Sequence, residues 1–267
     1  FYNHYGYYTG TYYPRQHLNS GFMIVKQVEH YIDPSRRLEL ARSFVTGAYK
    51  NIRQVLVYYE RREKQVGATI AHIDDLGSAL ESTSTIEQLM AIEGNIRDAY
   101  YGSFDTIIGD PDFPFVERSK RPPVNELNAL ISFGNSLMYT TTLSEIYRTH
   151  LDPRIGFLHA SNFRRFSLQL DVAEIFKPII VDRVIFTLLG KRMLKKTDFE
   201  KHLNGMALTQ KGRTTFIKEF EQKMLTTLKH RDLGREVTYR RLVRMELYKL
   251  EKHLMGERKY EPFVARW

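Results

Sequence analysis

The sequence predicts a mainly α protein with short strands and turns at its beginning. Apolar residues recur every three or four positions along most of the 267-residue chain, and Ser, Thr or Asp stands before many of these stretches as a helix N-cap. The first fifteen residues differ, because FYNHYGYYTGTYYPR is rich in aromatic residues and is interrupted by Gly and Pro. These observations favour a helical fold preceded by a small β-like segment.

The expected helices follow from apolar spacing and from start signals. Asp33 and Pro34 mark one helix start, Thr209 marks another, and Ser84 with Glu87 and Thr197 with Glu200 have the spacing of a capping box. Pro178 is expected to interrupt or kink its helix. An irregular loop is expected over residues 101–123, and helices over residues 18–31, 34–60, 70–80, 84–100, 125–148, 167–188, 209–229 and 236–255.

Composition limits the classes of function. The formal net charge is +9 and the sequence pI is about 9.5, which favours a polyanionic partner without separating DNA from RNA or an anionic membrane. The chain has no cysteine, which excludes disulfides, thiolate metal sites and cysteine nucleophiles. No apolar run of membrane-spanning length and no signal-peptide pattern is found, so we expect a soluble cytoplasmic protein without membrane contact.

Glu93 is an acid on the apolar face of its predicted helix. It follows Leu89 by four positions and precedes Ile96 by three, where an unpaired charge would cost several kcal/mol on order-of-magnitude grounds. Gly94 comes next and would let another backbone approach. Glu93 is therefore a candidate site residue, and the alternative is a buried ion pair with Arg97 one turn later.

Residues 156–178 bring one His, two acids and a basic turn together. Asp171 and Glu174 are three residues apart on a helix for which Ser167 is the expected N-cap, so their carboxylates project from one face. A divalent metal ion, or a nearby Arg or Lys, would offset their repulsion. His159 lies in the turn upstream, where the loop can fold it back over the acids. The alternative is a solvated helix face and an ordinary loop histidine.

These motifs resemble a known family. Glu93 in AIEGNIRDAY, His159 in GFLHA and the acids of LDVAEIFKP are similar to the three metal-ligand motifs of the CRISPR-associated adaptation integrases, the first Cas protein (Cas-one). Between them, RPPVNELNALISFGNSLMY resembles that family's Arg-Pro-Pro, Asn and Ser-Phe-Gly segment. The resemblance implies that residues 1–17 are the end of an N-terminal β-rich domain and a linker, and that residues 18–267 form the helical catalytic domain.

The resemblance also implies a site and partners. Glu93, His159 and Glu174 would be the catalytic metal ligands with Asp171 assisting, and which of the two acids binds the ion directly stays open. Carboxylates with one imidazole and no thiolate suit Mg²⁺ or Mn²⁺ better than Zn²⁺. The implied role is joining short DNA fragments into a repeat array with the second Cas protein (Cas-two). The family's homodimer is made largely through the β-rich domain, so dimerisation is in question for this chain.

Basic residues are the candidate DNA contacts. The polar face of the last helix and the loop at residues 190–196 are expected to bind phosphate nonspecifically, and Gly156, Ser161 and Arg165 to shape the turn that presents His159. The predicted DNA-contacting residues are Arg97, Arg121, Arg164, Arg165, Lys195, Lys196, Arg240, Arg241 and Arg244. Two other functions are kept: a stand-alone metal nuclease on branched or single-stranded DNA, and a noncatalytic helical DNA-binding protein.

Overall fold

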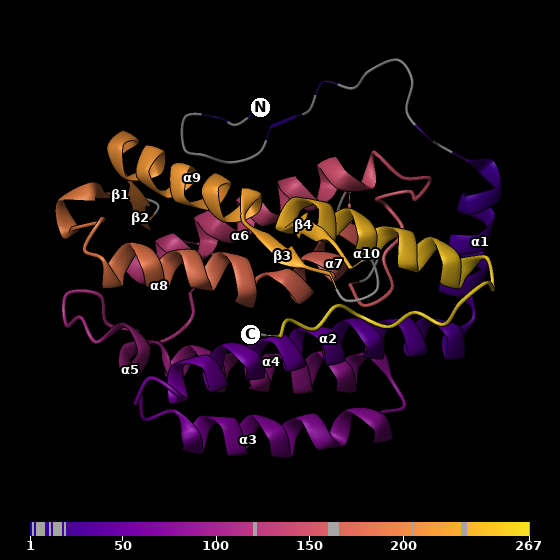
Figure 1. The fold of residues 1–267 in the computed structure, drawn as a ribbon, viewed down its shortest axis with the longest axis horizontal. Helices are drawn as coiled ribbons and strands as arrows, with labels where there is room; N and C mark the ends of the chain where they lie inside the picture. The colour runs from indigo at the N-terminus through magenta and orange to yellow at the C-terminus, as the bar shows by residue number, and fades with distance from the viewer. Residues whose placement is uncertain are drawn as a thin grey trace.

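The computed structural model describes most of the chain as helices joined by short loops, with two small hairpins (Figure 1). The strands and turns predicted for the first fifteen residues fall mostly outside the described residues. Those described are 1, 3, 9–10, 12, 18, 20–119, 122–159, 166–203, 205–230 and 234–266.

The first half of the chain forms the helices α1 to α5. Asp33 caps α2 as predicted, because its carboxylate accepts the N–H groups of Ser35 and Arg36. The capping box predicted at Ser84 is wrong, since Thr85 is the N-cap of α4. The elements are α1 Gly21–Ile32, α2 Pro34–Glu60, α3 Gly67–Ser78 with the 3₁₀ turn η1 Ala79–Ser82, α4 Ile86–Gly102 and α5 Phe104–Ile108. The short helix α5 lies in the predicted loop.

The second half contains the remaining helices. The predicted break at Pro178 takes the form of one π-helical turn, which joins two α-helices without ending the rod. Thr209 caps its helix as predicted. The elements are α6 Glu126–Ile146, α7 Leu168–Phe176, the π turn η2 Pro178–Asp182, α8 Arg183–Gly190, the 3₁₀ turn η3 Lys196–Asp198, α9 Gln210–Leu225 and α10 Tyr239–Leu254.

Two antiparallel hairpins occur where the sequence analysis predicted no strands. β1 Phe199–His202 pairs with β2 Gly205–Leu208, so the capping box at Thr197 and Glu200 is wrong. β3 Thr227–Lys229 pairs with β4 Glu236–Thr238, so α9 ends earlier and α10 begins later than predicted. The first hairpin turns at Gly205, whose φ of +106° is unfavourable for other residues.

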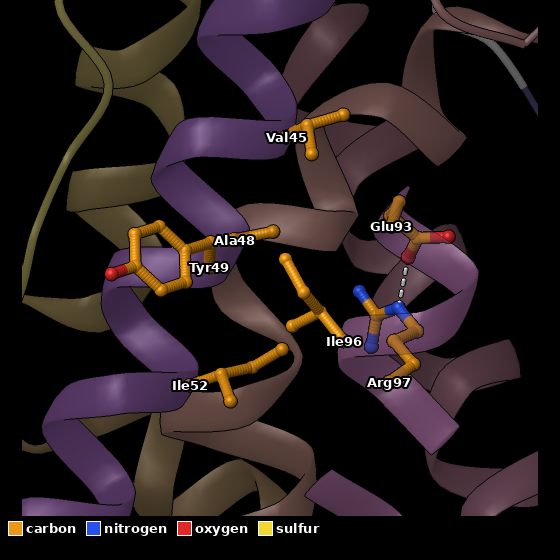
Figure 2. Close-up of a pocket in the computed structure, with 7 residues that line it drawn as sticks. All are labelled: Val45, Ala48, Tyr49, Ile52, Glu93, Ile96 and Arg97. Carbon is orange, nitrogen blue, oxygen red and sulfur yellow. Dashed lines mark hydrogen bonds and ion pairs between the residues drawn. The ribbon is translucent and has the colours of Figure 1, made fainter. Parts of the chain in front are cut away.

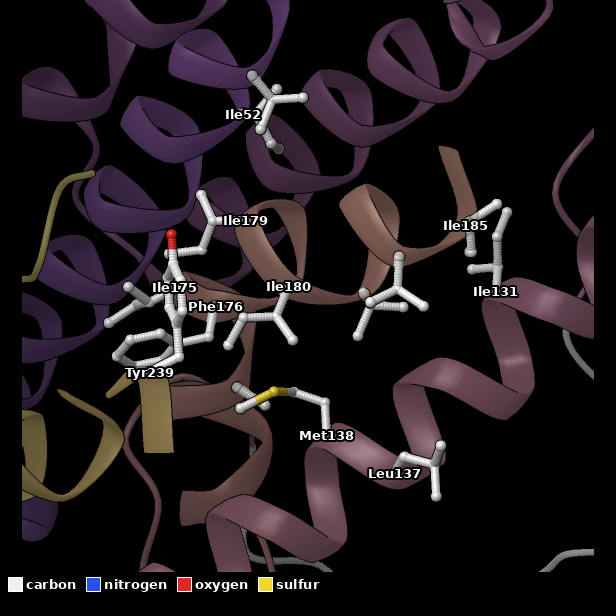
Figure 3. Packing of buried hydrophobic residues seen from close by; sticks show 14 of the residues in the cluster. Ile52, Ile131, Leu137, Met138, Ile175, Phe176, Ile179, Ile180, Ile185 and Tyr239 are labelled. Atoms are coloured by element: carbon white, nitrogen blue, oxygen red, sulfur yellow. The ribbon is translucent and has the colours of Figure 1, made fainter. Parts of the chain in front are cut away.

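The rod formed by α7, η2 and α8 lies in the middle of the molecule, between α2 and α6 (Figure 1). Ile175, Phe176, Ile179 and Ile180 are completely buried and pack between side chains of these two helices (Figure 3). Gly134 on α6 allows a close contact with the rod, because a Cβ there would lie 2.5 Å from Val181. The acids of α7 are therefore carried by the most deeply packed part of the fold.

The C-terminal segment packs back against α2 (Figure 1). The side-chain amide of Asn51 donates to the carbonyls of Ile175 and Phe263, both at 2.9 Å, and its oxygen accepts the N–H of Ala265 at 2.8 Å. The ring of Phe263 stacks on Phe176 of α7. None of the described helices is both long and apolar enough to cross a membrane.

Candidate active site

A loop and the helix that follows it hold His159 and Asp171 together. Asp171 is fully buried on α7, and its two oxygens accept the backbone N–H groups of Phe157, Leu158 and His159 at 2.6, 3.0 and 3.0 Å. The imidazole Nδ1 of His159 lies 2.8 Å from Oδ1 of the same carboxylate. The loop therefore folds His159 back over α7, as predicted.

Ser167 precedes α7, but its hydroxyl binds the loop and not the helix. The Oγ atom accepts the N–H of Gly156 and donates to the carbonyl of Arg154, both at 2.8 Å. It does not cap α7, so the prediction of a side-chain N-cap is wrong. Gly156 fits tightly here, because a Cβ would lie 2.8 Å from the Ser167 carbonyl carbon and 2.9 Å from Oδ2 of Asp171.

Two side-chain cations hold Glu174, one turn after Asp171. Lys177 donates from Nζ to Oε1 at 2.6 Å, and Arg97 donates from Nη2 to Oε2. Arg97 reaches this position from α4, where its Nε also donates to Oε1 of Glu93 (Figure 2). One guanidinium thus joins the two acids that were predicted as metal ligands.

Glu93 is partly buried, with 23% of its side chain exposed. The inward position of Glu93 agrees with the sequence prediction. The ion pair with Arg97, which the sequence analysis gave as the alternative to a site, is also present. A Cβ at Gly94 would have no atom within 4 Å, so the close backbone approach expected there is absent. Glu93 and Arg97 line a small pocket together with Val45, Ala48, Tyr49, Ile52 and Ile96 (Figure 2).

The charges of these groups act on one another. Burial alone would raise the pKa of Glu174, but the neighbouring Arg97 and Lys177 lower that pKa to about 2. Burial alone would lower the pKa of His159, but Asp171, Glu174 and Glu93 raise it above the usual value. The three predicted ligands therefore belong to one electrostatic cluster.

The donor types in this cluster fit a hard divalent cation. Glu93 and Glu174 supply carboxylate oxygens, and Asp171 occupies Nδ1 of His159, which leaves Nε2 to bind. A carboxylate on the remote nitrogen is the usual support of a metal-bound imidazole. As the side chains stand, the described residues contain no group of three arranged to hold an ion. The Arg97 guanidinium lies between the two acids that such an ion would join.

The predicted DNA contacts lie in several environments. Arg97 is buried inside the cluster. On α10, Arg244 is bound to the buried Glu145 at 2.6 Å and Arg240 to Glu221 at 2.8 Å, so both contribute to helix packing. Lys195, Lys196 and Arg241 are exposed, whereas Arg121, Arg164 and Arg165, together with Ser161, lie outside the described residues.

Sequence reasoning missed three groups at the cluster. Lys177 is buried and donates to Glu174 and, at 3.3 Å, to the hydroxyl of Tyr139. Its position three residues after Glu174 was the available signal. Asp182 and Tyr139 gave no signal, because only the packed fold brings the π turn and α6 next to α7.

Comparisons with known proteins agree with this architecture. The family described as CRISPR associated protein Cas1 matches residues 1–222. A CRISPR-associated endonuclease Cas1 of Thermodesulfovibrio yellowstonii is 57% identical over 267 residues, which are all of this chain and 81% of the relative. The solved structure of a Cas1 protein from Thermotoga maritima is similar with a TM-score of 0.87 and 44% identity, covering 100% of this chain and 80% of that one.

A more distant structure shares the fold alone. A casposase bound to integration product superposes with a TM-score of 0.83 at 21% identity, covering 91% of this chain and 67% of the other. The mainly α fold predicted from the sequence is therefore confirmed by both near and distant structures.

Proposed function

The chain belongs to the Cas1 family of CRISPR-associated proteins, and from this membership we propose that it is a metal-dependent DNA endonuclease and integrase of CRISPR adaptation. It would insert short DNA fragments into a repeat array through attack of a DNA 3′-hydroxyl on a phosphodiester. The endonuclease names of relatives such as the 57% identical protein support the nuclease chemistry. The net charge of +9 supports a nucleic acid substrate.

One observation carries the proposal: the buried carboxylate of Asp171 binds His159 and holds it in one cluster with Glu174 and Glu93. We assign Glu93, Glu174 and Nε2 of His159 as the groups that would hold Mg²⁺ or Mn²⁺. The hydrogen bonds that Asp171 accepts all come from the loop. We therefore propose that Asp171 orients His159 and does not bind the ion.

The bound ion would act as a Lewis acid on the phosphodiester and lower the pKa of the attacking hydroxyl. The chain's own residues do the rest. Asp171 holds the imidazole by Nδ1 and so leaves Nε2 available, and Lys177 keeps Glu174 ionised by direct contact. The ammonium of Lys177 also leaves positive charge beside the site, which favours the approach of a phosphate.

Partners follow from related complexes. Solved structures of Cas6-RT-Cas1–Cas2 complexes share the fold of this chain with a TM-score of 0.84 at 18% identity in one case. We propose a Cas2 protein as the partner and exposed Lys195, Lys196 and Arg241 as contacts to DNA phosphates. The roles proposed for Arg121, Arg164 and Arg165 rest on sequence alone.

The test is a strand-transfer assay with a labelled short duplex and a supercoiled plasmid in Mn²⁺, with and without a Cas2 protein. Glu93→Ala, His159→Ala and Glu174→Ala should each lower joining at least about a thousandfold, equivalent to about 4 kcal/mol of transition-state stabilisation. Asp98→Ala is the matched control, because Asp98 is an exposed acid on the same helix as Glu93. Circular dichroism should show that all four variants keep their helices.

The outcomes separate the alternatives. Joining by wild type and Asp98→Ala alone supports the integrase. Nicking without joining would instead indicate a stand-alone nuclease. The ion pair between Glu93 and Arg97 is also what a noncatalytic DNA-binding protein predicts. Salt-sensitive DNA binding without any metal-dependent reaction would favour that function and reject the proposal.

A further inference from the structure

The charges around Glu174 are balanced without any metal ion. Glu93 and Glu174 carry two negative charges, and Arg97 and Lys177 carry two positive charges in direct contact with them. Three of the four side chains are at most 10% exposed, so the pairs lie in an environment of low dielectric constant. A divalent cation that joined the same acids would face the positive charge of Arg97 at close range. The guanidinium must then leave or greatly weaken binding of the ion.

Asp182 is a candidate receptor for the displaced guanidinium. It lies at the end of the π turn and is 1% exposed, and the nearby Tyr100 hydroxyl is its neighbour, but neither of its oxygens makes a hydrogen bond of ordinary geometry. Within the described part of the chain it is the one buried carboxylate for which this holds at both oxygens. A buried acid without hydrogen bonds is costly, and such a group calls for an explanation.

Arg97 and Asp182 interact through their charges and have Tyr100 as a common neighbour. Tyr100 is three residues after Arg97 on the same face of α4, and its buried hydroxyl lies beside Asp182, although it too makes no hydrogen bond of normal geometry. Burial raises the pKa of Asp182 to about 7, and Arg97 is the strongest of the charges that oppose this rise. The Nη1 atom of Arg97 is also buried without a partner. Arg97 therefore has an unused donor, and Asp182, whose charge it feels, has unused acceptors.

We propose that Arg97 is an exchangeable counter-ion: it joins Glu93 and Glu174 when no metal ion is bound, and it moves to Asp182 when a divalent cation takes its place. This inference rests on the metal site of the proposed function. Arginine suits the role, because its planar guanidinium stays charged and binds a carboxylate through two parallel hydrogen bonds. Asp182 is thus a positioning residue for the occupied site, since it accepts the charge that the ion expels.

The test measures Mn²⁺ binding by the full chain with isothermal titration calorimetry, independently of DNA chemistry. Arg97→Gln removes the competing cation and should bind Mn²⁺ about tenfold more tightly. Asp182→Asn removes the receptor and should bind about tenfold more weakly. In the metal-free state, Arg97→Gln should melt at a lower temperature than wild type, because Glu93 loses its partner. Addition of Mn²⁺ should raise the melting temperature of Arg97→Gln by more than it raises that of wild type.

Arg244→Gln is the matched control, since it breaks an ion pair of another Arg with a buried acid away from the site. It should lower the melting temperature without changing the Mn²⁺ affinity. Unchanged or weaker Mn²⁺ binding by folded Arg97→Gln would overturn the inference, as would unchanged binding by Asp182→Asn. If Arg97→Gln does not fold, Asp182→Asn alone decides.

Failure of the metal site itself is distinguishable. Glu174→Ala should lose Mn²⁺ binding whether or not Arg97 is exchangeable. If wild type and Glu174→Ala both fail to bind Mn²⁺, the proposed function loses its metal centre and the inference falls with it. If binding requires Glu174 but does not respond to Arg97 or Asp182, only the exchange is rejected.

Discussion

Asp171 and Glu174 are neighbours on one face of α7, yet their surroundings are opposite in kind. Asp171 is bound by three backbone N–H groups and an imidazole of the preceding loop. Glu174 is bound by the ends of two long side chains, Arg97 and Lys177. A backbone donor cannot leave without unfolding its loop, whereas a side-chain cation exchanges by rotation about single bonds. The first acid is therefore part of the scaffold, and the second is available for chemistry.

The largest expected effect is a difference in protein stability between a variant at Asp171 and a variant at Glu174. Asp171→Ala should lower the free energy of unfolding by about 3 kcal/mol or more, because it leaves buried backbone N–H groups without an acceptor. Glu174→Gln should lower the free energy of unfolding by less, because Arg97 retains its ion pair with Glu93 and Lys177 retains its hydrogen bond to the hydroxyl of Tyr139. Urea unfolding in the presence of EDTA measures both. An equal or larger loss in Glu174→Gln would contradict the division into scaffold and chemistry.

A glycine substitution probes the scaffold from the loop side. Gly156→Ala should destabilise the protein by about 2 kcal/mol, because its Cβ would meet Ser167 and Asp171 at less than 3 Å. Gly94→Ala is the matched control beside the other half of the site. Nothing lies within 4 Å of its Cβ, so it should stabilise α4 by about 0.5–1 kcal/mol. Thermal unfolding of the two variants should shift in opposite directions, and a harmless Gly156→Ala would mean that the loop is loose.

The smallest effect is a dependence on pH. The pKa of His159 is raised above its ordinary value of 6.5, and a protonated imidazole cannot bind a metal ion. Mn²⁺ affinity should therefore fall by about tenfold per pH unit as the pH drops below a midpoint that lies above 6.5. In Asp171→Asn the same midpoint should move downward, because burial is then opposed only by the weaker effects of Glu174 and Glu93. Calorimetric titrations at several pH values would show whether the midpoint moves.

Local signals in the sequence were sufficient for most helices. Asp33 and Thr209 were correctly identified as caps, because a side-chain oxygen two or three residues from the orphan N–H groups is all that a cap requires. The same reasoning failed at Thr197 and Glu200, where Thr197 lies in the 3₁₀ turn η3 and Glu200 in the strand β1 that follows it. Hairpins this short depend on a turn such as that at Gly205 and on their packing, which the pattern of neighbouring residues does not encode.

The proximity of the candidate site residues was predictable, but their contacts were not. Motif spacing predicted that His159 lies over the two acids, and the inward position of Glu93 followed from helical periodicity. Three residues of separation could not show that Asp171 faces a loop and Glu174 faces α4. Likewise, Arg97 was predicted as a DNA contact from its charge, and only the folded structure, in which its side chain reaches from α4 to Glu174 on α7, reveals its burial between two acids.

The packing of the C-terminal segment against Asn51 also bears on the order in which the protein folds. Asn51 connects α7, through Ile175, to residues 263 and 265, so the segment that carries the acids of the candidate site is held by residues more than 200 positions away from Asn51 in the sequence. Contacts between residues so distant in the sequence form late in folding, because closing a long loop costs conformational entropy before the contact can form. We therefore expect the candidate site to be completed in one of the last steps of folding.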